Sequence, residues 1–187
     1  VGHNFFPMIV NSDERQWTWM DEGINSFVEI LAEYKYDSEL FPMKKYPKNI
    51  VGYMKGDQSS LTPIMTQGDN IINFGSNAYA KPAAGLYILR NTIMGPELFD
   101  HAFKTYAKRW KFKHPTPADF FRSMEDASAM DLDWFWRGWF YTTGNNDIGI
   151  KEVKKFYVTD KPTARAQNMA KRYGITVDQL PPSLYLV

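Results

Sequence analysis

Apolar residues recur with a helical period through most of the first 144 residues. After Glu22, Phe27, Ile30, Leu31 and Tyr34 repeat at intervals of three and four, and polar side chains occupy the opposite stripe. A repeat of this kind predicts an amphipathic helix that buries one face. Such patterns predict helices over residues 22–34, 82–94, 96–107, 117–127 and 134–141, and residues 1–10 are interpreted as the end of a helix.

Prolines and short polar residues indicate where these helices begin and end. Pro7 is expected near the end of the first helix, because an interior proline removes a backbone hydrogen bond. Asp21 is a plausible N-cap for the second helix. Pro82 suits the first position of a helix, which would place Tyr79 just before a helix N-terminus. Thr116, which is followed by a proline and an aspartate, is expected to cap a further helix.

Two other stretches are less regular. The part from residue 62 to residue 73 is expected to be a loop that lines a cleft. Near the end of the chain, residues 148–150 and 153–158 are candidates for short strands, and residues 162–173 for a helix that stops at Gly174. The last part of the chain is therefore predicted to mix strand and helix.

Length and composition indicate one helical domain with an appendage. A chain of 187 residues with 44% hydrophobic residues can bury a real core. We expect a mainly α domain over residues 1–144, then a short mixed tail over residues 145–187 that is an extension or the start of a following domain. The chain has no cysteine, which excludes disulfides and thiol catalysis. No apolar run approaches the roughly 20 residues that span a bilayer, so no membrane span is predicted.

The charge balance argues against a nucleic-acid or anionic-membrane surface. The chain has 22 basic and 21 acidic residues and a net charge of +1. Residues 108–114 form one basic and aromatic run, but a run of this length in a near-neutral chain is more typical of a solvated helix end. The dense aromatic stretch 134–141 is interpreted as core packing. No nucleic-acid partner is predicted.

The first candidate chemistry is a histidine and a glutamate near the start of the chain. His3 is followed by eighteen residues and then by Glu22. A catalytic zinc commonly takes two histidines and a glutamate, and water at a fourth position. With three histidines and eight glutamates, this spacing is expected by chance in about one such chain in eight. The alternative is a terminal histidine with no role and a glutamate favoured by the helix dipole.

The residues around this pair carry a family resemblance. Val1-Gly2-His3-Asn4-Phe5-Phe6, followed by Trp19-Met20-Asp21-Glu22-Gly23, resembles the zinc-binding core of the aminopeptidase N family of gluzincin metallopeptidases. The family's pattern is H-E-x-x-H, then eighteen residues, then a glutamate within the sequence W-x-[ND]-E-G. The resemblance covers about residues 1–144. It implies the helical lobe of a thermolysin-like catalytic domain.

The resemblance also implies roles for individual residues. His3 would be the second zinc histidine and Glu22 the third ligand, with the first histidine and the catalytic glutamate just upstream of Val1. Asp21 and Glu29 are candidates for carboxylates that orient the ligands, although a solvated face is the alternative for Glu29.

A tyrosine further along the chain completes the implied site. Tyr79-Ala80-Lys81-Pro82 resembles the family's Tyr-x-Lys-Gly segment, in which the tyrosine hydrogen-bonds the developing oxyanion, except that Pro82 replaces the glycine. Tyr79 is therefore a candidate catalytic residue. The alternative is a half-buried aromatic side chain whose hydroxyl faces water.

The resemblance implies a zinc-dependent metallopeptidase, and more narrowly an aminopeptidase that hydrolyses the amino-terminal residues of peptides with a zinc-activated water. One Zn²⁺ would occupy the complete site, and the upstream part of the same polypeptide would complete it. The isolated chain is expected to bind zinc weakly or not at all and to hydrolyse no peptide. Relatives suggest a secreted or periplasmic location. The alternative is a non-catalytic helical binding module that retains the fold and uses residues 134–141 and 145–187 as contact surfaces.

Overall fold

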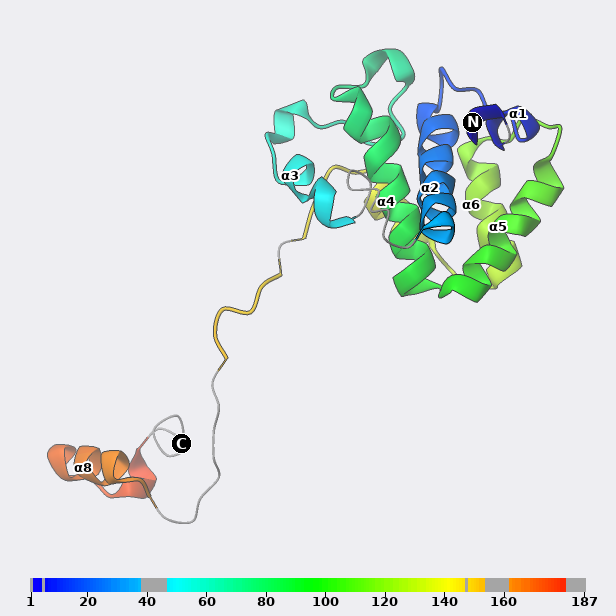
Figure 1. Ribbon diagram of the computed structural model, residues 1–187. Helices are drawn as coiled ribbons and strands as arrows, with labels where there is room; N and C mark the ends of the chain where they lie inside the picture. Colours follow the sequence, from blue (N-terminus) through cyan, green and yellow to red (C-terminus); the bar gives the residue numbers. More distant parts are fainter. Residues whose placement is uncertain (1, 5, 38–46, 147, 154–161, 181–187) are drawn as a thin grey trace. The chain divides into compact units, whose positions relative to one another are not determined.

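The computed structural model describes residues 2–4, 6–37, 47–146, 148–153 and 162–180. The chain divides into two compact units, residues 1–145 and 146–187 (Figure 1). Each unit is described by itself.

The first unit is built of helices, as predicted. Its segments are η1 (Gly2–Asn4), α1 (Phe6–Ile9), α2 (Thr18–Tyr36), η2 (Pro47–Ile50), α3 (Val51–Met54), η3 (Gln58–Ser60), η4 (Gly68–Asn70), η5 (Gly75–Ala80), α4 (Lys81–Ile88), η6 (Leu89–Ile93), α5 (Pro96–Trp110), α6 (Pro117–Ser128) and α7 (Asp133–Phe140). Segments η5 and η6 are π-helical and the other η segments are 3₁₀ turns. Among the described residues there is no strand beyond one isolated bridge between Val10 and Lys113.

Helix α2 is the central element of the first unit. In Figure 1, α2 lies between α4 on one side and α5 and α6, which pack against each other, on the other side. Its first half packs into an aromatic core with α5, α6 and α7. The fully buried members of that core include Trp19, Phe27, Phe99, Phe120, Trp136 and Phe140. Burial of this much aromatic surface supplies the main stabilising free energy of the unit.

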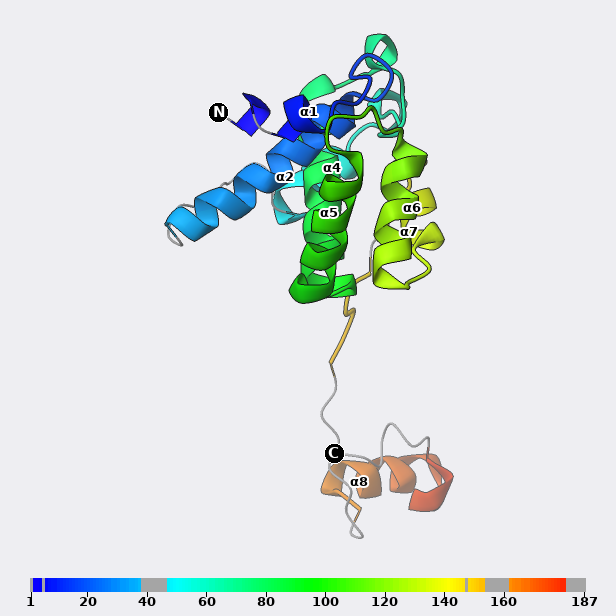
Figure 2. The ribbon, with the colours of Figure 1, turned by 90° about the vertical axis from the view of Figure 1, so that its right-hand side faces the viewer.

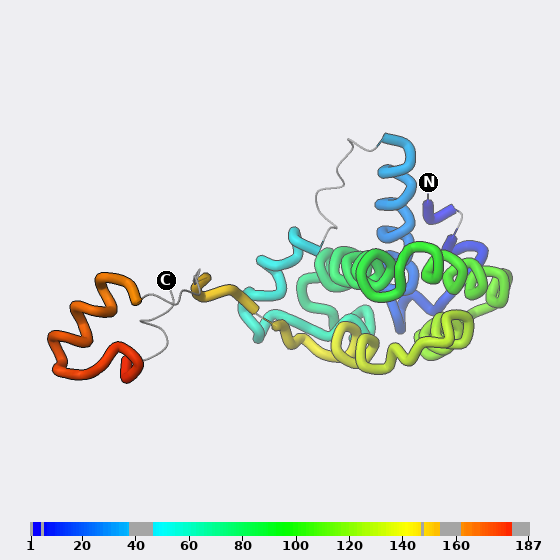
Figure 3. Tube along the Cα trace, turned by 90° about the horizontal axis from the view of Figure 1, so that it is seen from below, coloured from blue at the N-terminus to red at the C-terminus, as the bar shows by residue number. Residues whose placement is uncertain are grey.

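The second half of α2 projects away from the other helices (Figures 2 and 3). Tyr34, which the helical period placed on the buried face, is 58% exposed. That prediction was wrong because no neighbouring helix among the described residues covers the last turns of α2. In the aromatic stretch 134–141, Phe135, Trp136 and Phe140 are buried as predicted, whereas Trp134 and Tyr141, at the two ends of the stretch, are exposed.

Two predicted helix boundaries near the start of the chain were also wrong. Pro7 lies in the first turn of α1 and not at the end of a helix. In the first turn a backbone N–H has no acceptor within the helix, so the missing N–H of proline costs no hydrogen bond. Helix α2 begins at Thr18, so Asp21 lies within its first turn and is not the N-cap. The earlier start carries Trp19 and Met20 onto the buried face of the helix, and this burial outweighs a capping preference.

The helix around Pro82 is longer than predicted. The π-helical segment η5 runs directly into α4, so Tyr79 lies inside a continuous helical run and not before an N-terminus. At the junction the Lys81 N–H donates to the Ser76 carbonyl, five residues back. Since Pro82 has no N–H to donate, a wide turn accommodates it here without breaking the helix. The predicted cap at Thr116 is confirmed, with a reciprocal pair of hydrogen bonds to Asp119.

The second unit contains helix α8 (Ala164–Tyr173) and the 3₁₀ turn η7 (Val177–Gln179). Gly174 ends α8, as predicted, whereas the helix begins at Ala164 with Thr163 as its cap, two residues later than predicted. Residues 148–150 form no strand, and their isoleucines are almost fully exposed, because an extended segment needs a paired neighbour to become a strand. The strand predicted over residues 153–158 falls mainly outside the described residues. In the described part of the chain, no helix is both long and apolar enough to cross a membrane.

Candidate metal centre

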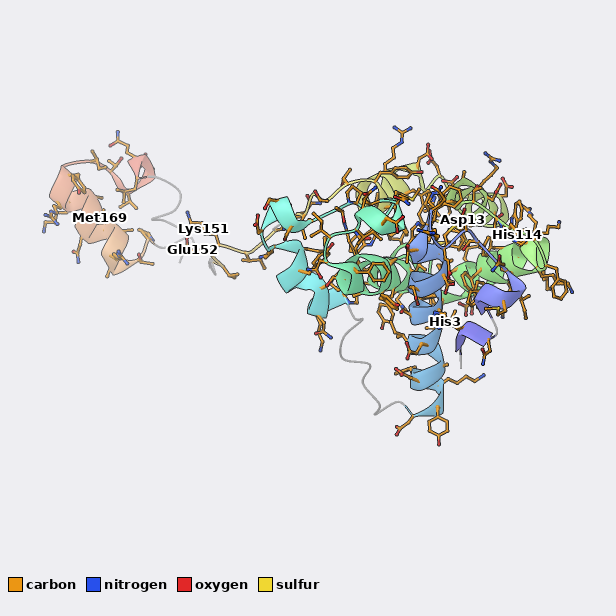
Figure 4. All side chains as sticks on the ribbon, turned by 90° about the horizontal axis from the view of Figure 1, so that it is seen from above. His3, Asp13, His114, Lys151, Glu152 and Met169 are labelled. Carbon is orange, nitrogen blue, oxygen red and sulfur yellow. The ribbon has the colours of Figure 1, made fainter. Side chains whose placement is uncertain are left out.

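One histidine and two carboxylates converge where η1 meets the first turns of α2. The His3 Nε2 atom lies 2.7 Å from Glu22 Oε2 and 3.1 Å from Asp21 Oδ1. Figure 4 shows His3 beside α2. Asp21 and Glu22 are held in place by their neighbours Trp19 and Met20, which are buried in the core. The local fold thus directs both carboxylates toward the separate turn that carries His3.

The environment of Asp21 is unusual for a carboxylate. Burial raises its pKa to about 6, assisted by a hydrogen bond with Glu14 and by the negative charge of Glu22. Its Oδ1 atom is buried and has no hydrogen-bond partner of good geometry, although it faces the imidazole. A buried carboxylate oxygen without a partner is expensive, and a cation would satisfy it.

The donor set fits a zinc ion. One imidazole nitrogen and two carboxylate oxygens lie within 4.8 Å of one another, and these are ligand types that Zn²⁺ accepts at about 2.0–2.2 Å. Two ligands of one tetrahedral zinc are about 3.3 Å apart at such bond lengths. The pair His3–Glu22 at 2.7 Å would therefore open by about half an ångström. A metal bound here would replace the hydrogen bond between His3 Nε2 and Glu22 Oε2.

The two carboxylates proposed to orient the ligands differ in position. Asp21 does not stand behind the ligands but points an oxygen at His3 Nε2 itself. Glu29 is exposed and follows Glu22 by seven residues of α2, a distance of about 10 Å along the helix. It therefore lies outside the cluster of donor atoms.

Tyr79 reaches the same place from η5. Burial, a hydrogen bond to Glu22, and the charges of Glu22 and Asp21 raise its pKa to about 12. The ring of Phe74 packs against it with centroids 6.1 Å apart. A hollow of about 290 Å³ opens beside these residues and is lined by Glu14, Arg15, Thr18, Glu22, Gly68, Asp69 and Phe74. The loop of residues 62–73 thus contributes to a hollow, as predicted.

Gly23 explains how Tyr79 and Glu22 meet. A Cβ atom at residue 23 would lie 2.5 Å from Pro82 Cγ and 3.0 Å from the Ala78 carbonyl oxygen. Helix α2 therefore touches the junction of η5 and α4 with no room for a side chain. The glycine of the Glu-Gly pair is the signal that sequence analysis could have used for this close approach.

Sequence analysis missed two buried polar residues near the site. Asn25 is 8% exposed, and its side-chain amide lies 3.2 Å from His3 Nδ1. Lys81 is 3% exposed, and its ammonium donates to the Thr142 carbonyl at 3.0 Å. The Trp139 indole in turn donates to the Lys81 carbonyl. Neither residue shows a sequence signal of burial, because both are polar and their partners are distant in the chain.

The sequence profile of the Peptidase family M1 domain matches residues 1–139. This chain belongs to peptidase family M1. The match covers all but the last six residues of the first unit and includes all the residues of the metal centre. The resemblance to the aminopeptidase N family is therefore confirmed at the level of the family. Family M1 peptidases are zinc-dependent in general.

Several curated aminopeptidases are similar to this M1 chain. Glutamyl aminopeptidase of Sus scrofa is 22% identical over 184 residues, which are 93% of this chain and 19% of that protein. Aminopeptidase N of Escherichia coli is 24% identical over 81% of the chain and 18% of its own length. Leucine aminopeptidase 2 of Emericella nidulans is 28% identical over 77% and 26%. The M1 chain thus spans about a fifth to a quarter of these relatives.

A second group of carboxylates in the M1 chain has a simpler explanation. Glu125, Asp131 and Asp133 also lie close together. Glu125 accepts the backbone N–H of Leu132, and Asp131 accepts that of Asp133. These bonds shape the turn before α7, so the group is accounted for by local structure.

Proposed function

We propose that these residues form the helical part of the catalytic domain of a zinc-dependent aminopeptidase. His3 and Glu22 would bind the metal, and Tyr79 would stabilise the oxyanion. The observation that supports this best is the meeting of His3 Nε2, Glu22 and Tyr79 at one point from three separate segments. Family membership and the names of the relatives support the same reading.

The residues suit these roles chemically. A zinc ion, when bound, lowers the pKa of its water to about 7 and polarises a carbonyl. His3 Nε2 and Glu22 would hold it, and Asp21 offers a further oxygen within reach. Tyr79, with a pKa raised to about 12, stays protonated at neutral pH. It can therefore donate a hydrogen bond to negative charge that develops on a substrate carbonyl oxygen.

The printed sequence contains only part of such a site. The motif H-E-x-x-H would place a first histidine ligand and a general base immediately before Val1. We infer that the polypeptide preceding Val1 supplies them. The 187 residues alone would then bind zinc weakly and hydrolyse no peptide, because a catalytic zinc needs three protein ligands and a base.

The test uses the natural polypeptide that contains these residues, with its sequence read upstream of Val1. We expect one zinc per chain and hydrolysis of aminoacyl-p-nitroanilides. Glu22→Gln should weaken zinc binding by at least about 100-fold. Glu29→Gln changes an exposed glutamate of the same helix and should leave zinc binding unchanged. Tyr79→Phe should keep zinc but lower kcat by about 10²–10³-fold.

Other outcomes would overturn the proposal. A preceding sequence without His-Glu, or equal zinc binding in the wild type and Glu22→Gln, would remove the zinc-hydrolase reading. The non-catalytic helical binding module would then be the better description. Zinc-loaded Tyr79→Phe with normal kcat would remove only the role of Tyr79.

A further inference from the structure

Asn25 is the third residue of α2 that faces His3, after Asp21 and Glu22. It follows Glu22 by three residues, so the two side chains share one face of the helix. Its Nδ2 atom lies 3.2 Å from His3 Nδ1, while Glu22 lies at the opposite ring nitrogen, 2.7 Å from Nε2. The imidazole is thus held between an amide and a carboxylate.

The amide orientation decides where the imidazole proton lies. With Nδ2 toward His3, the amide donates to Nδ1, so a neutral ring carries its proton on Nε2 and donates it to Glu22. A metal on Nε2 requires the other tautomer, because Nε2 must then offer a lone pair and Nδ1 must carry the proton. That proton needs an acceptor beside Nδ1.

A turn of the amide by about 180° would supply this acceptor, since Asn Oδ1 and Nδ2 are nearly equal in shape. The ring stays neutral throughout, because Nε2 gives its proton to water and Nδ1 takes one from water, which reaches the ring since the His3 side chain is 45% exposed. An aspartate could only accept from Nδ1–H, and an aliphatic side chain could do neither. An asparagine can hydrogen-bond to Nδ1 in both tautomers of the histidine, as a donor in one and as an acceptor in the other.

Gly2 leaves room for this side chain. A Cβ atom at residue 2 would lie within van der Waals overlap of Asn25 Oδ1 and 3.1 Å from its Cγ. The residue just before His3 is therefore small where the Asn25 amide packs against the backbone. This contact keeps the amide next to the imidazole rather than in solvent.

We propose that Asn25 is the positioning residue that selects the tautomer of His3, donating to Nδ1 when Nε2 is protonated and accepting from Nδ1–H when Nε2 binds the metal. This inference rests on the proposed zinc site. It assigns Asn25 no contact with substrate.

The experiment compares three variants of the natural polypeptide. Asn25→Leu is close in size but cannot hydrogen-bond, Asn25→Asp can only accept, and Asn91→Leu changes an exposed amide that donates to the Tyr87 carbonyl. Zinc affinity is measured by competition with a chelator, and the His3 tautomer by ¹⁵N NMR of the ring with and without zinc. Circular dichroism confirms that each variant is folded.

We expect the His3 proton on Nε2 without metal and on Nδ1 with zinc. Asn25→Leu should bind zinc about 10–100-fold more weakly. Asn25→Asp should hold the proton on Nδ1 even without metal and bind zinc at least as tightly as the wild type. Asn91→Leu should match the wild type.

Three results would contradict this assignment or its basis. Wild-type affinity and tautomers in Asn25→Leu would show that Asn25 does not set the tautomer. Equal weakening in Asn25→Leu and Asn25→Asp would show a packing role and overturn the inference. A wild-type protein that binds no zinc would instead overturn the proposed function.

Discussion

Lys81 is a charged residue in a place where charge is disfavoured. Its ammonium is buried where α4 begins, and it donates to the Thr142 carbonyl just after α7. Burial lowers its pKa to about 8 from the ordinary 10.5, because the charged form loses hydration that one hydrogen bond replaces only in part. It follows Tyr79 by two residues, so it attaches the tyrosine segment to the end of α7.

This lowered pKa predicts how stability depends on pH. The unfolded chain binds more protons than the folded one between pH 8 and pH 10.5, so the free energy of unfolding should rise with pH in that window. Below pH 8 Lys81 is charged in the folded chain as well, so the full free-energy cost of burying its charge remains. Between pH 8 and pH 10.5, the free energy of unfolding of the wild type should rise by on the order of 2 kcal/mol relative to that of Lys81→Met.

The measurement is urea denaturation of both proteins at several pH values between 7 and 10.5. Lys108→Met, at an exposed lysine of α5, serves as the control and should follow the wild type. Parallel pH profiles for the wild type and Lys81→Met would show that Lys81 titrates as it does in the unfolded chain.

At the scale of elements, the contact between α2 and α4 decides whether the site assembles. Gly23 of α2 meets Pro82 of α4 without space for a methyl group. The contact brings the junction of η5 and α4 against the turn of α2 that carries Glu22, and Tyr79 lies on that junction. Helix pairs approach this closely only where a residue at the crossing is small.

Gly23→Ala should therefore destabilise the protein by about 1–3 kcal/mol, because the added methyl group must push the two helices apart. Gly138→Ala provides the matched control: it is also a helical glycine, but a Cβ atom there meets nothing within 4 Å. It should be neutral or stabilising by up to about 1 kcal/mol. Thermal and urea unfolding would measure both, and a neutral Gly23→Ala would contradict the close approach.

At the scale of the whole molecule, the two units have very different cores. In the described part of the first unit, 21 buried residues form one continuous core. The described core of the second unit consists of Ala166, Ala170 and Leu180, with Met169 and Val177 packed against them. The described part of this unit buries too little apolar surface to offset the conformational entropy of its own folding.

We therefore expect residues 1–145 to unfold cooperatively as an isolated fragment, and helix α8 to be largely unfolded in a fragment of residues 146–187. Circular dichroism and differential scanning calorimetry of the two fragments would test this. A cooperative transition in the shorter fragment, or a non-cooperative one in the longer fragment, would show that the division into units does not reflect independent stability.

Local signals in the sequence were enough for the helices and for the candidate ligands. The helical period, the Thr116 cap and the Gly174 stop depend on neighbours three or four residues apart, and so does the motif around Glu22. Pro7 and Asp21 were misplaced because burial of nearby apolar residues outweighed their local preferences.

The composition of the site, in contrast, depended on contacts between distant segments. Only the packing of α2 against α4 places Tyr79 beside Glu22, and only the fold of η1 onto α2 places Asn25 and Asp21 beside the His3 ring. The sequence by itself determined which helices form and which side chains can bind a metal, because those properties are local. The tertiary structure decided which of these side chains meet and which become buried, because burial and close approach depend on the whole core.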